Sequence, residues 1–424
     1  MIPIYDSSHY ENSSLHEPFL ERAADTEAQE AGNNGLGAFL TLRLIDQFSA
    51  DREKIHREAT AYQTTATGEF LNDIYPQTPE VTHLRELVRV AGTALDTNDR
   101  RLLLPPMMAF AFWLEQELRL AEALDVLNTA LRLSDGRDGE EEVAAYLQYA
   151  RVLRMQGDFE DARESYAHSG DIAARIGDEH SVLLSQIGHG MVLQKVGNLP
   201  ESERVLREVI KEAQRVGNRD AEARAHHDLG GTLYFGGRAR DAIPLAYRAF
   251  ELHQSPLRRA RALSDAGSML KEIGCYTAAG HAFAIVLSNH PAPEVRAHTV
   301  LELLELSAQI GDRISFERWR QELVQPGGDL TPDQQIDLEI KLGSGFALFG
   351  QLDRSDKHLS GAVALAESYG MGERLFFAEK KLNDLRENRT AEINSTVLPS
   401  GQQDESGVQD TITRLEVLVA DVVG

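Results

Sequence analysis

The stretch Gly157-Asp158-Phe159-Glu160-Asp161-Ala162 decides the fold, because relatives of it recur along the chain at a nearly constant interval. When the glycine positions are aligned, successive copies start 37 to 40 residues apart. The seven starts are Leu118, Gly157, Gly197, Gly237, Gly274, Gly311 and Gly350. A period of this length predicts one supersecondary unit that is copied and stacked along the chain.

Two further positions in each copy carry small residues. The fifth residue after the start is small in six of the seven copies, and so is the seventh residue before it. Small residues on both sides of a glycine turn let two helix backbones approach closely. In the sixth copy Leu304 and Phe316 replace the small residues, and we expect a wider helix crossing or a local kink there.

This pattern resembles the tetratricopeptide-repeat family. The shared features are the small residue midway along the first helix, the Gly-polar-aromatic turn of Gly157-Asp158-Phe159 and Gly274-Cys275-Tyr276, and the small residue early in the second helix. The family's usual period is about 34 residues, slightly shorter than the one here. The resemblance covers roughly residues 105–387 and implies an all-α fold. We therefore expect a right-handed α-solenoid of about seven helix hairpins with an N-terminal helical subdomain and a C-terminal capping helix.

Composition and turn residues divide the chain into four predicted segments. Residues 1–37 are acidic and end in a glycine-rich run, which predicts a disordered arm. Residues 38–100 show helical periodicity without the repeat, so we expect a separate helical subdomain or cap, its first helix running from Ala38 into the fifties. Residues 101–388 form the solenoid, and its capping helix is predicted over 373–387. Residues 389–424 read as a flexible acidic tail.

The end of the predicted tail allows two interpretations. Its last residues carry apolar side chains at helical spacing, namely Ile412, Leu415, Val417, Leu418, Val419, Val422 and Val423. We expect a frayed terminus, with a short amphipathic element that docks on the repeats or on another chain as the alternative.

The net charge and the cysteine content indicate which binding partners and which cellular compartment suit this protein. The net charge of −24 disfavours direct binding to nucleic acid, whose affinity for proteins is largely electrostatic. Cys275 is the only cysteine, which fits a reducing compartment. The first thirty residues lack the basic start and apolar core of a secretory signal, and no apolar run is long enough to span a bilayer. We expect a cytoplasmic protein with no membrane partner.

No catalytic or metal-binding constellation is expected. His226, His227 and Asp228 are adjacent, but neighbouring helical residues point about 100° apart and cannot hold one ion together. The glycine runs around Gly230 and Gly237 lack the Gly-Lys-Ser/Thr ending of a phosphate loop. Cys275 has no second cysteine nearby. We therefore predict no enzyme activity, no cofactor and no metal.

The family resemblance implies that the first helix of each repeat lines a concave groove. Transferring the family's groove positions to this chain gives the candidate ligand-binding residues Arg151, Arg154, Met155, Ile187, Met191, Lys195, Arg224, His227, Tyr234, Arg261 and Lys271. Basic side chains on one surface of an acidic protein favour an acidic ligand. The apolar residues beside them favour an apolar one. The predicted partner is a protein or peptide with acidic and apolar residues.

Several alternatives stay open at this stage. The arginines are equally consistent with a role in solubilising exposed helix faces, and the methionines with a place in the core. The leading hypothesis is a scaffold or adaptor for protein–protein interaction. The layout of a helical module followed by seven repeats also resembles bacterial peptide-responsive regulators of the Rap type, whose module moves when a peptide binds. A third hypothesis is the ligand-sensing half of a transcription regulator. A homo-oligomer is also possible.

Overall fold

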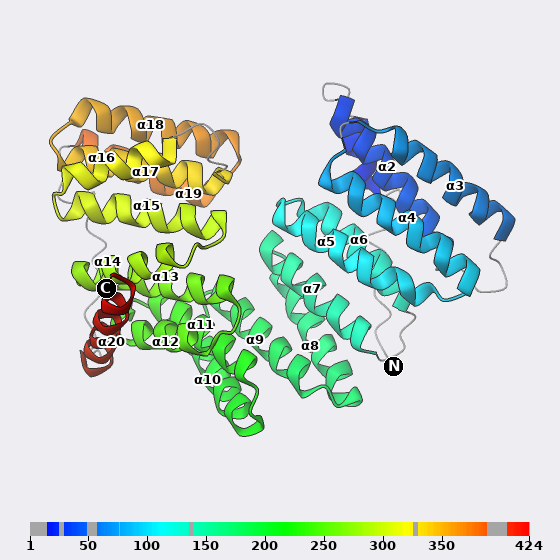
Figure 1. The fold of residues 1–424 in the computed structure, drawn as a ribbon, viewed down its shortest axis with the longest axis horizontal. Coiled ribbons are helices and arrows are strands. Elements are labelled where there is room, and N and C mark those ends of the chain that lie inside the picture. The colour runs from blue at the N-terminus through cyan, green and yellow to red at the C-terminus, as the bar shows by residue number, and fades with distance from the viewer. Residues whose placement is uncertain are drawn as a thin grey trace. The chain divides into compact units, whose positions relative to one another are not determined.

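The computed structural model describes residues 15–24, 29–48, 57–75, 77–134, 139–324, 330–387 and 405–423. Within these ranges the chain forms α-helices and one 3-10 helix, and it contains no strand. The chain divides into two compact units, residues 1–197 and 198–424 (Figure 1). None of the helices in the described ranges combines the length and the apolar character that crossing a bilayer requires.

Unit 1 contains the first nine α-helices and the 3-10 helix. They are α1 (Glu17–Ala23), α2 (Gln29–Asp46), α3 (Arg57–Asp73), α4 (Pro79–Thr97), η3 (Arg100–Leu103), α5 (Leu104–Gln116), α6 (Leu120–Ser134), α7 (Glu140–Gln156), α8 (Phe159–Ile176) and α9 (Glu179–Lys195).

Unit 2 contains the remaining helices that the structure describes. They are α10 (Leu199–Val216), α11 (Arg219–Phe235), α12 (Ala239–Leu252), α13 (Pro256–Glu272), α14 (Tyr276–Ser288), α15 (Pro293–Gln309), α16 (Arg313–Val324), α17 (Pro332–Leu348), α18 (Leu352–Ser368), α19 (Gly372–Arg386) and α20 (Glu405–Val423).

The predicted repeat register is confirmed by the backbone. Each predicted start lies in the turn between two helices, so the first helices of the seven repeats are α5, α7, α9, α11, α13, α15 and α17. All seven starts have a positive φ, between 58° and 100°. Glycine adopts this left-handed conformation without a steric penalty, which explains why six of the seven starts are glycine. Leu118 adopts it with φ 58°.

The small positions are buried where the two helices of a hairpin meet. Gly267 lies so close to Phe283 that a Cβ atom would be 2.6 Å from its ring. In the sixth repeat Phe316 fills the small position and is fully buried. Its ring fits against Gly345 of α17, where a Cβ atom would lie 2.4 Å away. The missing side chain at Gly345 therefore makes room for the large one at Phe316.

The N-terminal region differs from the predicted disordered arm over part of its length. Residues 17–23 form α1, and the glycine-rich run before Ala38 lies inside α2 instead of in a loop. Its glycines serve helix packing, because a Cβ atom on Gly35 would be 2.8 Å from the backbone of α1. Gly37 similarly lies against Leu71 of α3. Residues 1–14 of the predicted arm lie outside the described residues.

The predicted separate N-terminal subdomain shares a core with the first repeats. One continuous set of buried side chains runs from Phe19 of α1 through Leu84 of α4 to Phe110 of α5 and beyond. The rings of Phe19 and Phe110 stack with their centroids 6.4 Å apart. The helices α1 to α4, called the N-terminal module below, are thus packed directly onto the first repeat.

The C-terminal region contains the expected cap and one helix that the flexible-tail prediction did not include. Helix α19 follows the seventh repeat at the predicted position. Its Phe376 is exposed. Residues 405–423 form α20, which packs against α12 and α14 within unit 2 (Figure 1). Residues 388–404 of the predicted tail lie outside the described residues.

Candidate functional site

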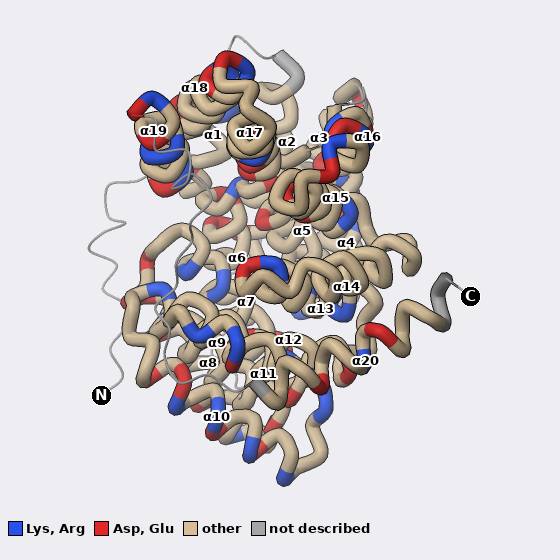
Figure 2. Tube along the Cα trace, turned by 90° about the vertical axis from the view of Figure 1, so that its left-hand side faces the viewer, with Lys and Arg blue, Asp and Glu red and all other residues tan. Residues whose placement is uncertain are grey.

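The predicted ligand-binding residues all lie on first helices, in two groups. Unit 1 holds those on α7 and α9, and unit 2 holds those on α11 and α13. Each group therefore forms a surface of its own within its unit. Lysine, arginine and acidic residues are interspersed along the helices instead of gathering in one basic stripe (Figure 2).

In unit 1 the predicted residues differ in how accessible they are. Arg151 pairs with the buried Glu115 at 2.6 Å and lies over the Phe112 ring, 5.6 Å from its centroid. The side chain of Met155 is exposed, whereas Ile187 is buried and belongs to the packed interior.

Two of the predicted basic residues of unit 1 have no ion-pair partner among the described residues. They are Arg154 at the end of α7, which is half-buried, and Lys195 at the end of α9, which is exposed. The Nε atom of Arg154 is buried without a hydrogen-bond partner. Met191 of α9 is half-buried. Among the predicted residues of unit 1, Arg154 and Lys195 are therefore the bases that remain open to an acidic ligand.

In unit 2 the predicted residues are joined to the neighbouring repeat by polar pairs. A period of about 38 residues places equivalent positions of successive first helices side by side, so side chains about one period apart can meet. His227 of α11 lies 2.7 Å from Asp265 of α13, and Arg261 of α13 lies 2.9 Å from Glu294 of α15. We call this series of pairs between successive first helices of unit 2 the first-helix ladder.

At one end of the ladder two arginines share a single carboxylate. Arg224 of α11 and Arg258 of α13 lie 2.8 Å and 2.9 Å from the two oxygens of Asp220. Beside them His253 is only 3% exposed, and neither of its ring nitrogens has a hydrogen-bond partner. Burial lowers the pKa of His253 to about 4, helped by the charges of His227 and Arg258. The ring is therefore neutral at physiological pH.

The middle of the ladder contains its most buried charges. Lys271 of α13 and Lys341 of α17 both contact Glu302 of α15, each at 2.8 Å. Both lysines also contact Glu305, one turn further along α15. Lys271, Glu302 and Lys341 are all at least nine-tenths buried. Tyr234 of α11 donates its hydroxyl hydrogen to Glu272 of α13.

In this cluster, burial and ion pairing shift the pKa values in opposite directions. Burial opposes the charged form of Glu305, but the lysine charges outweigh it and lower its pKa to about 2. Burial also opposes the charged form of Lys341, yet the carboxylates around it raise its pKa well above the ordinary value.

Asp337 of α17 is the carboxylate that pairing satisfies least. Burial raises its pKa, and the charges of Glu302 and Glu305 raise it further. Its nearest cation is Lys341, 3.7 Å away. Asp337 keeps 20% of its side chain exposed.

The structure thus adds carboxylates to the predicted basic surface. The ligand-binding residues predicted from the sequence include no carboxylate. In the structure Asp265, Glu294 and Glu302 are partners of these bases. A signal for them is present in the sequence, since each acid follows its base by 31 to 38 residues, close to one repeat period.

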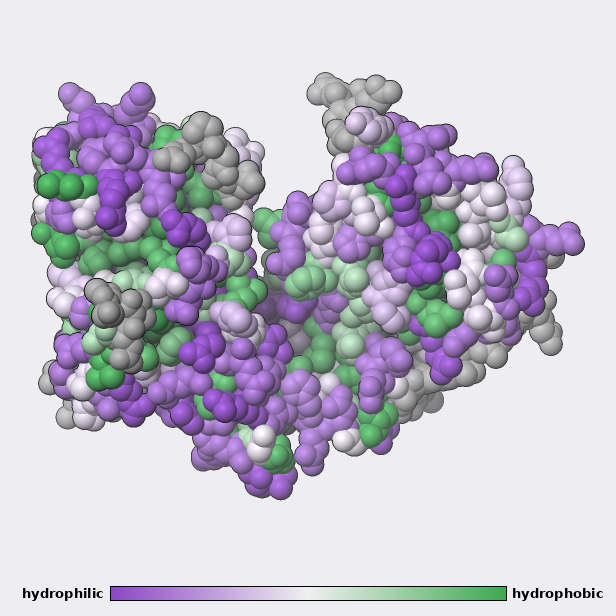
Figure 3. All heavy atoms as spheres, in the orientation of Figure 1, coloured by the Kyte–Doolittle hydropathy of each residue, from purple (hydrophilic) through white to green (hydrophobic). Residues whose placement is uncertain are grey.

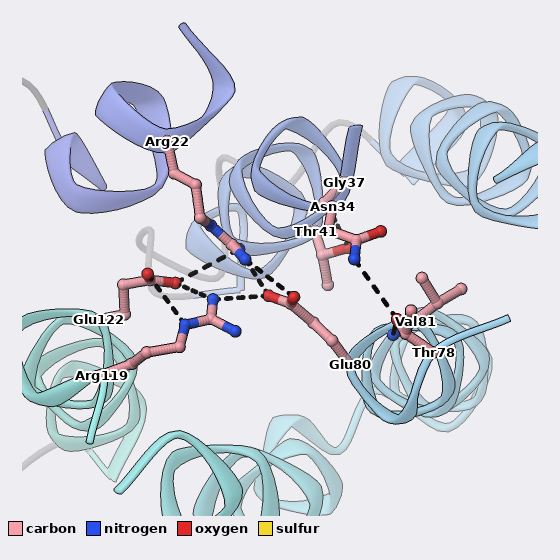
Figure 4. Close-up of polar contacts among 9 residues, drawn as sticks. All are labelled: Arg22, Asn34, Gly37, Thr41, Thr78, Glu80, Val81, Arg119 and Glu122. Carbon is pink, nitrogen blue, oxygen red and sulfur yellow. Dashed lines mark hydrogen bonds and ion pairs between the residues drawn. The ribbon is translucent and has the colours of Figure 1, made fainter. Parts of the chain in front are cut away.

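A second polar cluster joins the N-terminal module to the first repeat (Figure 4). Arg22 of α1 and Arg119, in the turn before α6, converge on the buried Glu80 of α4, with distances of 2.5 Å and 2.7 Å. Both arginines also contact Glu122 of α6. Burial works against the charge of Glu80, but the two guanidinium groups keep its pKa below the ordinary value.

His16 forms a third polar connection in unit 1. Its Nδ1 lies 2.6 Å from Asp125 of α6, and its Nε2 lies 3.0 Å from Asp46 of α2. Its side chain is fully buried. Both nitrogens can donate to carboxylates only when the ring is protonated. Although burial lowers the pKa of His16, hydrogen bonds to the two aspartates outweigh it and leave the pKa raised.

Within the described ranges, no group of three or more histidine, cysteine, aspartate or glutamate side chains is placed to hold a metal ion. Cys275, at the start of α14, is a partly exposed free thiol.

Comparison with known proteins identifies the repeat and the fold. Residues 181–255 match the model of the tetratricopeptide-repeat family. No curated protein matches the chain by sequence.

Several solved structures are similar in fold at low sequence identity. The apo form of the quorum sensor NprR from B. thuringiensis is 11% identical, with a TM-score of 0.51 over 80% of this chain and 94% of that one. A Rap protein in complex with competence and sporulation factor is 12% identical, with a TM-score of 0.46 over 85% of this chain and 99% of that one. The apo form of RapI is also 12% identical, with a TM-score of 0.48 over 79% and 99%.

The likeness to NprR agrees with the all-helical solenoid that the repeat pattern predicts. The left-handed turns at all seven starts extend the hairpin of residues 181–255 along the chain. The chain contains tetratricopeptide repeats, which the family model identifies over residues 181–255.

Proposed function

We propose that this chain is a non-enzymatic scaffold that binds a peptide or an extended protein segment along its first helices. The observation that carries the proposal is the first-helix ladder of unit 2. Ion pairs with buried members, such as Lys341 and Glu302, add little net stability compared with apolar packing. A stack of helices does not require them. Recognition of a polar ligand gives a reason for placing them on one surface.

Exposed apolar residues at the ends of the first helices support the same proposal. Phe235 ends α11, Leu348 ends α17 and Ile310 directly follows α15, and the side chains of all three are exposed. They occupy equivalent positions, one or two residues before the glycine starts. A row of apolar groups beside a row of charged pairs suits a peptide that has both kinds of side chain.

The ladder also refines the expected ligand. A purely acidic ligand would have to displace the carboxylates that already neutralise Lys271 and Arg261. A peptide that carries both acidic and basic groups can pair with each member of an ion pair that it separates. No buried charge is then left without a partner. Asp337 offers a site for its cationic group. On the separate surface of unit 1, Arg154 and Lys195 are available to acidic groups of a ligand.

Selection from a library of random linear peptides tests the proposal. The full-length chain is immobilised, peptides displayed on phage are enriched, and the affinity of the best ones is measured by fluorescence anisotropy. The first-helix variant Arg151→Glu, Arg154→Glu and Arg224→Glu should weaken binding by about tenfold or more. The matched control reverses Arg204 and Arg207, which are exposed on the second helix α10. Equal losses in both variants, or no loss in the first, would refute the assignment of the surface.

A second candidate function is a peptide-responsive regulator whose N-terminal module moves. The observation that favours it is the charged contact between the module and the first repeat, formed by Arg22, Glu80, Arg119 and Glu122 (Figure 4). These ion pairs lie at the same junction as the apolar core of Phe19, Leu84 and Phe110, and charged pairs can exchange partners when packed elements shift. Small-angle scattering with and without a selected peptide separates the two functions. A moving module predicts a change in the radius of gyration, and a static scaffold predicts none.

A further inference from the structure

The C-terminal helix α20 packs as an amphipathic helix on the second helices of two repeats. Its buried side chains are Val408, Thr411 and Leu415, which follow one another at spacings of three and four residues. Val417 lies on the opposite side and is 61% exposed. The helix contacts α12 and α14. We call the face that these two helices present to α20 the second-helix surface.

The sequence of α14 sets this surface apart from the other second helices. Residues 276–288 contain no aspartate, glutamate, lysine or arginine, whereas α6, α8, α10, α12, α16 and α18 each contain several. A second helix that faces water needs charged residues on its outer side. Hydrophobic residues reach the surface of unit 2 around α14 and α15 (Figure 3). The uncharged α14 therefore matches a surface that another helix covers.

One ion pair defines how α20 is oriented on this surface. Arg414 lies 2.8 Å from Glu251 of α12. The charges of Arg414 and Asp410 both act on the pKa of Tyr247, which places this buried ring of α12 beside α20. The second-helix surface therefore fits a helix that has apolar residues at the spacing of Val408 and Leu415 and a basic residue at the position of Arg414, opposite Glu251.

The attachment of α20 depends on few side chains. Three residues of the described part of α20 are fully buried, and its one ion pair to α12 is partly exposed. Partly exposed ion pairs contribute little. Residues 388–404 tether α20 to α19, and a covalent tether gives a segment an effective concentration in the millimolar range. Weak intrinsic binding is then enough to keep the surface covered.

We propose that the second-helix surface is a docking site for an amphipathic helix of a partner protein, and that α20 is a built-in competitor for it. The partner helix would carry apolar residues at positions i and i+7, a small side chain such as threonine at i+3 and a basic residue at i+6, which meets Glu251. Only a helix that binds more tightly than α20 can overcome the tether. The proposal concerns a different surface from the peptide site on the first helices and does not depend on it.

A synthetic peptide of residues 404–423 serves as the probe, with the full-length chain as the receptor. Leu415→Asp in the receptor places a charge in the buried stripe and releases α20. The matched control Val417→Asp changes the exposed side of the same helix. We expect the Leu415→Asp chain to bind the labelled peptide about tenfold or more tightly than the wild type, and the Val417→Asp chain to behave as the wild type.

Hydrogen exchange and a charge swap complete the test. In the Leu415→Asp chain, the amides of α20 should exchange fast while those of α12 and α14 stay protected. Adding Glu251→Arg to the Leu415→Asp chain should lower its affinity for the peptide. A peptide that carries Arg414→Glu should restore that affinity.

Three outcomes would overturn the proposal. The first is that α20 stays protected in the Leu415→Asp chain, and the second is that the released surface does not bind the peptide. The third is equal affinity for the wild-type and Leu415→Asp chains.

Discussion

Lys341 of α17 lies 2.8 Å from Glu302 of α15, and more than nine-tenths of each side chain is buried. The two residues belong to consecutive repeats, so their contact joins neighbours that also share the apolar core around Leu304 and Phe346. Lys271 approaches the same carboxylate from the preceding repeat. Glu302 thereby links three repeats of unit 2.

Lys341→Met should destabilise unit 2, because it removes one of the two cations that neutralise Glu302. We expect a loss of about 2 kcal/mol in the free energy of unfolding, measured with urea. Adding Glu302→Gln should cost less than the sum of the single changes, since the buried charge is then gone. Arg204→Met, at an exposed pair, is the control and should cause no measurable change. Additive losses would mean that the two side chains do not depend on each other.

His16 should make the stability of the N-terminal module depend on pH. Its pKa in the folded protein is raised above 6.5, so protonation favours the folded state. This contribution is fully present below pH 6.5 and is lost as the pH rises through the raised pKa. The free energy of unfolding, measured from pH 6 to 9, should therefore fall in the wild type and fall less in His16→Gln. Asp125→Asn, which removes one partner, should give an intermediate slope, and identical slopes in all three would refute the assignment.

Gly345→Ala should be destabilising in spite of the higher helix propensity of alanine. The new Cβ atom would lie 2.4 Å from the ring of Phe316, and such overpacking costs about 1–3 kcal/mol. Phe316→Leu should relieve the clash, so the double variant should be more stable than the two single losses predict. Gly68→Ala in α3 should be stabilising, because alanine has the higher helix propensity and its Cβ atom would lie 3.7 Å from the nearest neighbouring atom. Thermal unfolding checks all four proteins.

Leu118→Gly should stabilise the first repeat, because Leu118 occupies the left-handed turn that the other repeats fill with glycine. Relief of the left-handed strain is worth about 1 kcal/mol. The converse change, Gly157→Ala, should cost a similar amount, since a Cβ atom there meets no neighbour within 4 Å and only strain remains. A loss of stability in Leu118→Gly would instead show that the packing of the half-exposed side chain matters more than its backbone.

The sequence was informative wherever local backbone chemistry decides the structure. The seven starts could be predicted because a left-handed turn selects glycine, and even Leu118 was placed by its spacing alone. The partners in the ladder could not be predicted in the same way. Whether Lys271 meets Glu302 depends on the rotation of α13 and α15 about their axes, which the repeat period does not specify.

Two segments were predicted less well, for a different physical reason. The run from Gly32 to Gly37 has the composition of a loop, yet it lies in α2 because Gly35 and Gly37 allow α1 and α3 to approach. Of the apolar residues that allowed either a free or a docked segment, Leu415 is buried and Val417 is exposed. The complementary surface comes from α12 and the uncharged α14, which lie far earlier in the chain.

The first-helix ladder also restricts how this array can change during evolution. In solenoids whose repeats resemble one another, units can be gained, lost or shuffled because every junction is equivalent. Here the acids of α15 match lysines on both sides, so loss of this repeat would bring the like charges of Lys271 and Lys341 together. The repeats of unit 2 are therefore an ordered series, in which each junction accepts only its own neighbours.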